Sequence, residues 1–147
     1  MAAMPLRALA IVAVGCLLGA AVNAVSPRGI SWTRPLGDGL RAKAAAAGLL
    51  PIGLEAARGL QGKALFLDAR PLEEFSIGRL PGAVALDPDS TALPPRGRPI
   101  VVYCANEFCE TSLRLGRRLT AAGFRDVALF VEGYEAWWNA RLPVDEN

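Results

Sequence analysis

Hydrophobic positions change their spacing several times along the chain, and each change predicts a different element. Residues 8–27 carry no charged side chain, and a helix over residues 8–25 would cover roughly 27 Å, close to the thickness of a bilayer core. Prolines and glycines then mark turns through residues 26–50, with the helix-forming run LRAKAAAAG near the end. We therefore predict an N-terminal hydrophobic helix at residues 1–25 and a juxtamembrane linker, with a short helix, at residues 26–50.

From residue 51 onward, short apolar runs alternate with segments that have helical spacing. Continuous apolar runs predict buried strands at residues 64–69, 99–104 and 127–131, and a Pro-Gly turn leads into another short strand within residues 80–86. Helical segments are predicted at residues 54–60, 71–78, 110–123 and 132–143. This alternation predicts an α/β fold over residues 51–147, with three layers and a central parallel sheet flanked by helices.

Composition narrows the class of protein. At 52% hydrophobic and 20% charged residues, the 147-residue chain can build one ordinary core. Residues 51–147 hold 11 basic and 13 acidic side chains, a mildly acidic balance that gives no sign of nucleic-acid binding. The chain has no histidine and three cysteines, which excludes imidazole bases, Cys-His dyads and histidine or four-thiolate zinc sites. We expect no metal and no cofactor.

The N-terminal apolar segment has three interpretations. It fits an uncleaved membrane anchor, a signal peptide cleaved after Val22-Asn23-Ala24, or a lipoprotein signal ending at Cys16. Its length exceeds the 7–15 residues of a usual signal core, which favours the anchor. Arg7 favours a cytoplasmic N-terminus, although Arg28 and Arg34 compete at the other end. We expect a single-pass protein of a bacterial inner membrane whose C-terminal domain is periplasmic or extracellular.

The stretch YCANEFCETS at residues 103–112 contains the candidate chemistry. Cys104 ends a predicted buried strand, where ligand sites of parallel sheets lie, and a helix follows it. Unpaired N–H groups at the start of that helix would favour the nucleophilic thiolate, although a buried cysteine is also a small apolar side chain. Cys109 fits either a resolving thiol that closes a disulfide with Cys104 or a small residue that packs in the first helical turn.

Residues 52–144 resemble the rhodanese-like domain family through a series of ordered motifs. These are Asp68-x-Arg70, Glu74-Phe75, Gly78 to Ala83, Val102-Tyr103-Cys104, Ala122-Gly123-Phe124 and Gly133 followed four residues on by Trp137. The resemblance implies that Cys104 accepts a sulfane sulfur as a persulfide and passes it to a thiol. It also implies that the backbone amides of residues 105–110 form a cradle around the sulfur. The chain is similar in particular to exported, membrane-anchored members with a Cys-x-x-x-x-Cys loop.

Two departures from the family pattern affect the expected chemistry. Arg79 replaces the usual histidine of a structural turn. Glu107 and Glu110 stand in the loop where relatives that act on thiosulfate usually carry arginine or lysine. Carboxylates repel an incoming dianion and disfavour a thiolate, so thiosulfate is a poor candidate donor. Glu110 also stands where a phosphatase or arsenate reductase would need an arginine.

These observations define a set of candidate site residues. We expect Cys104 and Cys109 to be catalytic, and Asp68 and Arg70 either to contact substrate or to form an ion pair that supports the loop. The loop residues expected to contact substrate are Ala105, Asn106, Glu107, Phe108 and Glu110.

The predicted function is a rhodanese-like sulfurtransferase or persulfide carrier. Its expected partners are a small sulfur donor, a thiol acceptor and, through the N-terminal helix, a membrane; the sequence identifies no protein partner. One alternative is a thiol-disulfide redox protein that uses Cys104 and Cys109 without transferring sulfur. Another is a membrane-tethered binding module whose loop is inactive.

Overall fold

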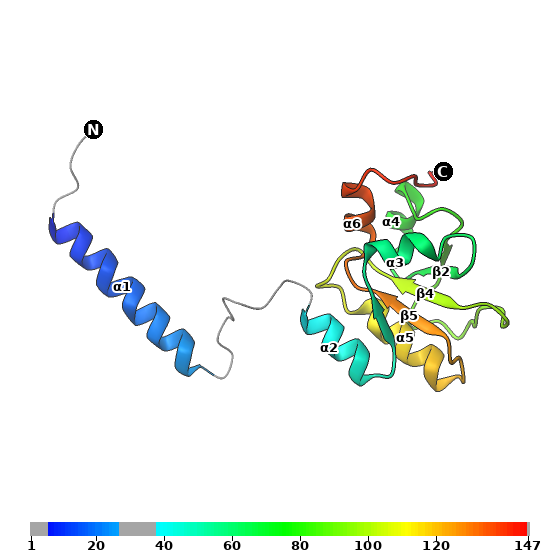
Figure 1. Cartoon of the computed structure of the whole chain (residues 1–147), viewed down its shortest axis with the longest axis horizontal. Helices are drawn as coiled ribbons and strands as arrows, with labels where there is room; N and C mark the ends of the chain where they lie inside the picture. The colour runs from blue at the N-terminus through cyan, green and yellow to red at the C-terminus, as the bar shows by residue number, and fades with distance from the viewer. Residues whose placement is uncertain (1–5, 27–37, 147) are drawn as a thin grey trace. The chain divides into compact units, whose positions relative to one another are not determined.

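The structure is a computed structural model that describes residues 6–26 and 38–146. The chain divides into two compact units, residues 1–34 and residues 35–147, and each is described by itself. The first contains helix α1 (Leu6–Val25; Figure 1), which has a mean hydropathy of 2.3 over Ala8–Val25. By length and composition α1 could cross a membrane, a test that an N-terminal signal sequence also passes.

The second unit is built on a five-stranded sheet in the order β1-β5-β4-β2-β3, and all its strands are parallel. The strands are β1 (Leu50–Ile52), β2 (Leu65–Asp68), β3 (Val84–Ala85), β4 (Ile100–Tyr103) and β5 (Val127–Phe130). Both β4 and β5 are buried along their whole length, as their uninterrupted apolar sequences require. The predicted fold class, a parallel α/β sheet flanked by helices, is confirmed.

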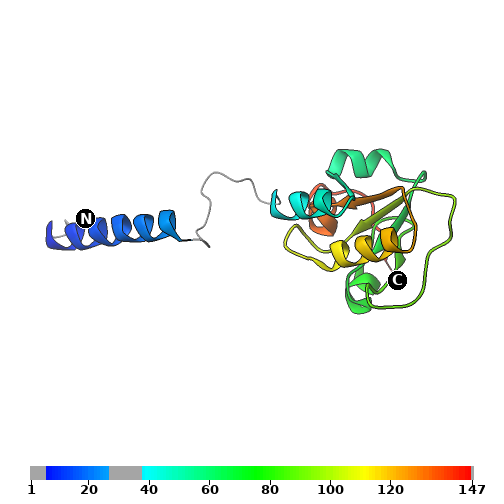
Figure 2. The same cartoon turned by 90° about the horizontal axis from the view of Figure 1, so that it is seen from below.

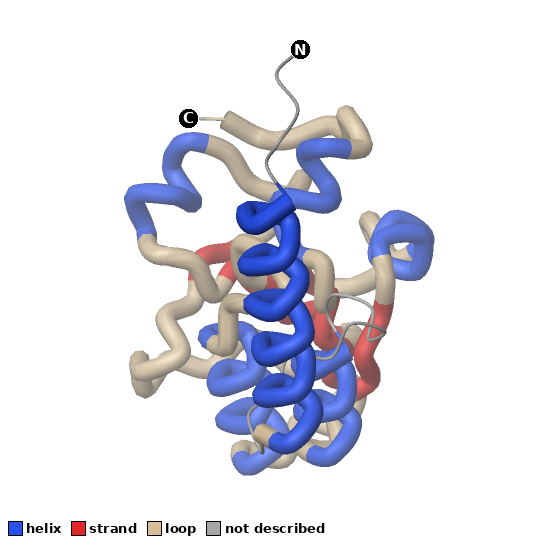
Figure 3. Tube along the Cα trace, turned by 90° about the vertical axis from the view of Figure 1, so that its left-hand side faces the viewer, coloured by secondary structure: helices blue, strands red, loops and turns tan. Residues whose placement is uncertain are grey.

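Five helices complete the unit and lie on both sides of the sheet (Figures 1 and 2). They are α2 (Asp38–Ala46), α3 (Leu54–Gly59), α4 (Leu72–Ile77), α5 (Thr111–Ala121) and α6 (Gly133–Asn139). Alternate residues of each strand face opposite layers: Val102 packs in one cluster with α2 and α5, whereas Val101 and Tyr103 pack with α3 and α6. The tube view in Figure 3 shows these helices and strands separated by loops.

The segment just before residue 51 is structured. Helix α2 corresponds to the short helix predicted within the linker, and its Leu40 and Ala44 are buried in the core beside α5. Strand β1 was not predicted, because it has three residues and contains Pro51. It lies at the sheet edge, where a proline is tolerated. Residues 27–37 of the predicted linker lie outside the described residues.

The chain's two tyrosines should not titrate at their ordinary pKa of about 10. Burial raises the pKa of Tyr103 strongly, and the Asp68 carboxylate raises it further. Burial also raises the pKa of Tyr134, although Arg70 opposes the change. Each tyrosine therefore binds its proton more tightly in the folded state, so its contribution to stability is present below about pH 10 and is lost as pH rises further.

We expect phenolate absorbance to appear above pH 10. It should appear together with unfolding, which the loss of near-ultraviolet circular dichroism reports. In Tyr103→Phe the component that coincides with unfolding should shrink, because Tyr134 alone remains. A reversible two-tyrosine titration centred near pH 10 in a protein that stays folded would contradict this expectation.

Candidate active site

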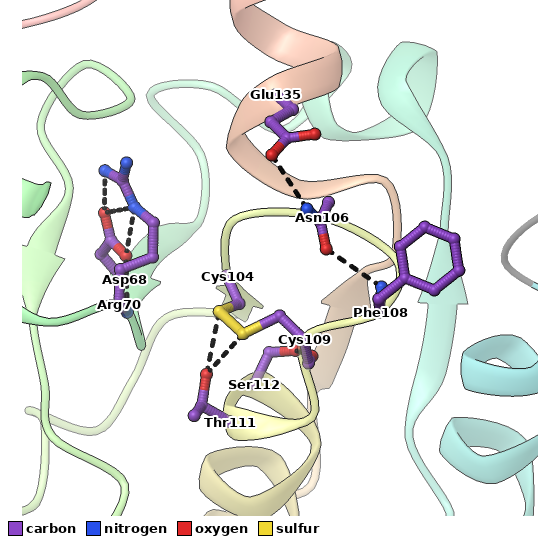
Figure 4. The surroundings of a disulfide bond; sticks show 9 residues. All are labelled: Asp68, Arg70, Cys104, Asn106, Phe108, Cys109, Thr111, Ser112 and Glu135. Carbon is purple, nitrogen blue, oxygen red and sulfur yellow. Dashed lines mark hydrogen bonds and ion pairs between the residues drawn. A yellow bond between two sulfur atoms is a disulfide. The ribbon is translucent and has the colours of Figure 1, made fainter.

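The site lies where the central strand β4 ends. Tyr103 is the last residue of β4, Cys104 follows it, and the loop returns to begin α5 at Thr111 (Figure 4). Cys104 is only 2% exposed, whereas Cys109 is half-buried. The predicted position of Cys104 at the carboxyl end of a buried parallel strand therefore matches the structure.

A disulfide joins Cys104 and Cys109, whose Cα atoms are 6.1 Å apart. The sequence left this pairing open. The hydroxyl of Thr111 lies between the two sulfurs: it donates to Cys104 Sγ at 2.9 Å and lies 3.0 Å from Cys109 Sγ (Figure 4). Sequence reasoning missed Thr111, although a hydroxyl residue at the first position of a helix after a cysteine loop is a recognisable signal. Thr111 can stabilise negative charge on a sulfur when the disulfide opens.

Asn106 holds the loop closed between the two cysteines. Its side-chain oxygen accepts from the N–H of Phe108 at 3.1 Å, and its backbone oxygen accepts from the N–H of Cys109 at 3.2 Å. Its amide nitrogen donates to Glu135 of α6 at 2.9 Å. Two of the loop amides that the family resemblance assigns to a sulfur cradle are thus bonded to Asn106 in the disulfide form.

The start of α6 fixes the other side of the loop. The N–H groups of Tyr134 and Glu135 donate to the carbonyl oxygens of Cys104 and Ala105, each at 2.9 Å. Gly133 comes directly before them with φ of +64°, and a Cβ there would lie 2.4 Å from the Cys104 oxygen. Only glycine fits this close approach, so Gly133 positions the chain around the reactive cysteine.

Asp68 and Arg70 form a buried ion pair behind the loop. Their side chains are 0% and 4% exposed, and Arg70 Nη2 donates to Asp68 Oδ2 at 2.6 Å and to the Gly78 carbonyl oxygen at 2.7 Å. The guanidinium also stacks over the ring of Tyr134 at 4.0 Å. The pair therefore connects the end of β2 to the Gly78 turn and to α6, while its contact with a substrate stays a prediction.

A cavity of about 540 Å³ lies on the side of the loop where Thr111 projects. Its lining includes the backbone or side chains of Arg70, Leu72, Asp87, Thr111 and Arg114. Thr111 connects this cavity to the disulfide, because it lines the cavity and its hydroxyl contacts both sulfurs, whereas neither cysteine is among the lining residues.

Helix α2 supplies cations to the acidic loop. Lys43 forms an ion pair with Glu110, and its hydrogen bond and its charge lower the pKa of that carboxyl group. Arg41 pairs with Glu132, which comes directly before α6. Glu107 forms no ion pair with any residue in the described part of the chain. One of the two carboxylates of the loop, Glu110, is thus neutralised by Lys43 of α2. The sequence did not predict this ion pair.

The fold and the site define a parallel α/β domain with a disulfide-bonded cysteine loop between its central strand and the next helix. The family model described as "Rhodanese-like domain" matches residues 54–140, more than half of the chain. The chain therefore belongs to the rhodanese-like domain family, and a sulfurtransferase-type or related function is supported at the level of the family.

The chain is also similar to individual proteins. A curated relative, the HTH-type transcriptional regulator Rv0324 of Mycobacterium tuberculosis, is 35% identical over 90 residues, which are 58% of this chain and 39% of that protein. The chain thus spans about two fifths of that relative's length. A rhodanese-related protein from Thermoplasma volcanium has a TM-score of 0.59 at 17% identity and covers 67% of this chain and 99% of that one.

The rhodanese-like domain of the Alr3790 protein from Anabaena sp. has a TM-score of 0.55 at 23% identity, covering 66% and 79% of the two chains. At such identities these two structures show the fold alone.

Proposed function

We propose that this protein is an exported, membrane-anchored persulfide carrier in which Cys104 accepts sulfane sulfur and Cys109 releases it. The observation that carries the proposal is the Cys104–Cys109 disulfide at the end of β4, within hydrogen-bond reach of Thr111. The family assignment supports sulfur chemistry at Cys104. The second cysteine of the Cys-x-x-x-x-Cys loop, Cys109, supplies a thiol that could release the sulfur.

The first step loads the sulfur. The Cys104 thiolate attacks the outer sulfur of a persulfide or polysulfide, the donor's S–S bond breaks, and the remaining donor leaves as a thiolate or shorter polysulfide. The Cys104 persulfide then has two routes. An external thiol attacks the outer sulfur and carries it away, or Cys109 attacks Cys104 Sγ and expels hydrosulfide.

In the second route the new S–S bond is the observed disulfide. The two protein thiolates lose two electrons in total, and the sulfane sulfur gains them as it leaves as hydrosulfide. Another turnover then needs an external dithiol to reduce Cys104 and Cys109. Disulfides persist in oxidising compartments, so the observed disulfide is compatible with the proposed periplasmic or extracellular location beyond the anchor α1.

The charge of the loop supports an uncharged or monoanionic donor. Glu107 lacks a cationic partner among the described residues, and Lys43 is already engaged by Glu110. A thiosulfate dianion would be repelled by an uncompensated carboxylate of the same loop more strongly than a hydropersulfide or short polysulfide, which carries less charge.

The second candidate is a thiol-disulfide protein, which the disulfide itself favours. In that function Cys104 and Cys109 exchange electrons with a partner dithiol and no sulfur atom is retained. The third function, an inactive tethered binding module, requires neither cysteine.

Intact-mass spectrometry of the full chain in detergent separates these functions, with Cys16→Ser as the background because Cys16 is a free, exposed thiol. The reduced protein is exposed to polysulfide, and Cys104→Ser and Cys109→Ser are compared. We expect Cys109→Ser to retain one added sulfur on Cys104, the parent to return to the disulfide with release of hydrosulfide, and Cys104→Ser to lose both reactions.

If Cys109→Ser gains no sulfur while the parent still forms the disulfide, the thiol-disulfide function replaces the proposal. If none of the proteins changes mass, the inactive binding module replaces the proposal.

A further inference from the structure

The two sulfurs of the disulfide differ in access. Cys104 is 2% exposed at the end of the central strand, whereas Cys109 is half-buried at the loop's outer turn. A protein thiol that reduces this disulfide therefore reaches Cys109 more easily. When Cys109 is attacked, Cys104 leaves as a thiolate within hydrogen-bond reach of the Thr111 hydroxyl, which lies 2.9 Å from its sulfur.

The residue before Cys109 is an exposed aromatic. Phe108 is 70% exposed, while the other four phenylalanines of the chain are buried or half-buried. Figure 4 shows its ring extending from the loop on the side away from the disulfide. An exposed phenylalanine next in sequence to a half-buried cysteine is typical of a contact surface.

A small hollow of about 190 Å³ lies between α2 and this part of the loop. It is lined by Gly39, Leu40, Lys43, Glu107, Phe108 and Glu110. Lys43 and Glu110 neutralise each other as an ion pair, which leaves Glu107 as the uncompensated charge of the hollow. The hollow therefore combines an aromatic wall with one net negative charge. A lysine or arginine side chain has matching chemistry: its methylenes pack on apolar groups and its cation faces the carboxylate and the ring.

We propose that Glu107, Phe108 and Cys109 form the docking surface for a reducing protein dithiol whose reactive cysteine is flanked by lysine or arginine. This inference rests on the proposed function, because it names the partner that regenerates the thiols after sulfur release. The basic side chain enters the hollow, the loop phenylalanine contacts the partner's apolar rim, and the partner thiolate attacks the accessible sulfur.

The electron balance is that of disulfide exchange. The partner thiolate forms a bond to Cys109 Sγ, the Cys104–Cys109 bond breaks, and Cys104 leaves as a thiolate beside Thr111. The partner's second thiolate then attacks the partner sulfur of the mixed disulfide and releases Cys109, which takes up a proton. The partner dithiol is oxidised by two electrons, and the loop disulfide is reduced by two.

The test uses the oxidised full chain in detergent, in the Cys16→Ser background, with two cysteine peptides as probes. The peptides share one sequence except that the cysteine is flanked by two lysines in one and by two glutamates in the other. Each reaction is quenched with iodoacetamide, and the modified cysteines are located by proteolysis and mass spectrometry. We expect the peptide on Cys109 and the alkyl group on Cys104. At low ionic strength the lysine peptide should react about tenfold faster, and 0.5 M salt should remove most of the difference.

Variants assign this preference to the hollow. Glu107→Gln should lower the rate ratio of the two peptides, and Lys43→Gln should raise it, because the charge of Glu110 is then released. Phe108→Ala should slow the lysine peptide. The matched control is Glu55→Gln on α3, an exposed carboxylate on the other side of the sheet that pairs with Arg58 and should leave the ratio unchanged. Dithiothreitol carries no basic side chain, so its rate of reduction should not follow the rate ratio of the two peptides across these variants.

Equal rates for the two peptides at low salt, or a peptide found on Cys104, would overturn the docking proposal. Failure of the proposed function has a different signature, because sulfur loading is measured separately by intact mass. A protein that loads sulfur but does not discriminate between the peptides keeps the carrier function and loses this surface. A protein that discriminates between the peptides but does not load sulfur would have the docking surface and would be a thiol-disulfide protein.

Discussion

Replacing Asp68 by asparagine should lower the free energy of unfolding by about 3–5 kcal/mol, the usual cost of leaving a buried charge without its partner. The substitution keeps the side chain's size but removes the negative charge from a pair whose members are 0% and 4% exposed. The guanidinium of Arg70 would stay buried against Tyr134 and the Gly78 carbonyl group. Urea unfolding followed by circular dichroism measures the change.

The matched control for this variant is Asp89→Asn. Asp89 also forms an ion pair with an arginine, Arg114, but both side chains are more than half exposed. Exposed pairs contribute about 0–1 kcal/mol, so the control should unfold almost as the parent does. Comparable losses in the two variants would mean that burial of the Asp68–Arg70 pair does not determine its importance.

Replacing Gly133 by alanine should both destabilise the domain and impair sulfur loading on Cys104. A left-handed residue other than glycine costs about 1–2 kcal/mol. The new Cβ would also lie 2.4 Å from the carbonyl oxygen of Cys104 and 2.8 Å from that of Ala105. Both atoms are backbone, so relief of the overlap must move the cysteine loop or the start of α6. We expect a loss of stability beyond the conformational cost and a slower gain of sulfur by intact mass.

Gly62→Ala provides the control for the overlap. Gly62 has φ of +72°, but a Cβ there would meet no atom within 4 Å. The control variant should therefore show only the conformational cost and normal sulfur loading. If the two variants lose equal stability and load sulfur equally, the close approach of Gly133 does not position the loop.

The sequence predicts those parts of the site that depend on local pattern. The apolar run before Cys104 and the helical spacing after Glu110 placed the cysteine at the end of a central strand, and the structure has this arrangement. Asp68 and Arg70 are two residues apart, so an ion pair between them could be considered without knowing the fold.

Other parts depend on contacts between distant segments. Lys43 and Glu110 are 67 residues apart and meet only because α2 packs beside α5. No local pattern in residues 38–46 distinguishes a helix that enters the core from one that stays in solvent, since alanine serves both. The pairing of Cys104 with Cys109 could not be predicted for a related reason. A separation of five residues permits a disulfide but does not require one, and the loop conformation that brings the two cysteines together includes the hydrogen bonds of Asn106.

The packing of α2 has a consequence for where a soluble fragment of this protein should begin. A fragment cut at Pro51 would omit Leu40, Ala44 and Leu49, all buried against the core. It would leave uncovered the face of α5 on which Leu49 rests against Gly116. It would also release Glu110 and Glu132 from Lys43 and Arg41, and so increase the negative charge around the cysteine loop. Reactivity measured on such a fragment would belong to a differently charged site, so fragments should start before Asp38.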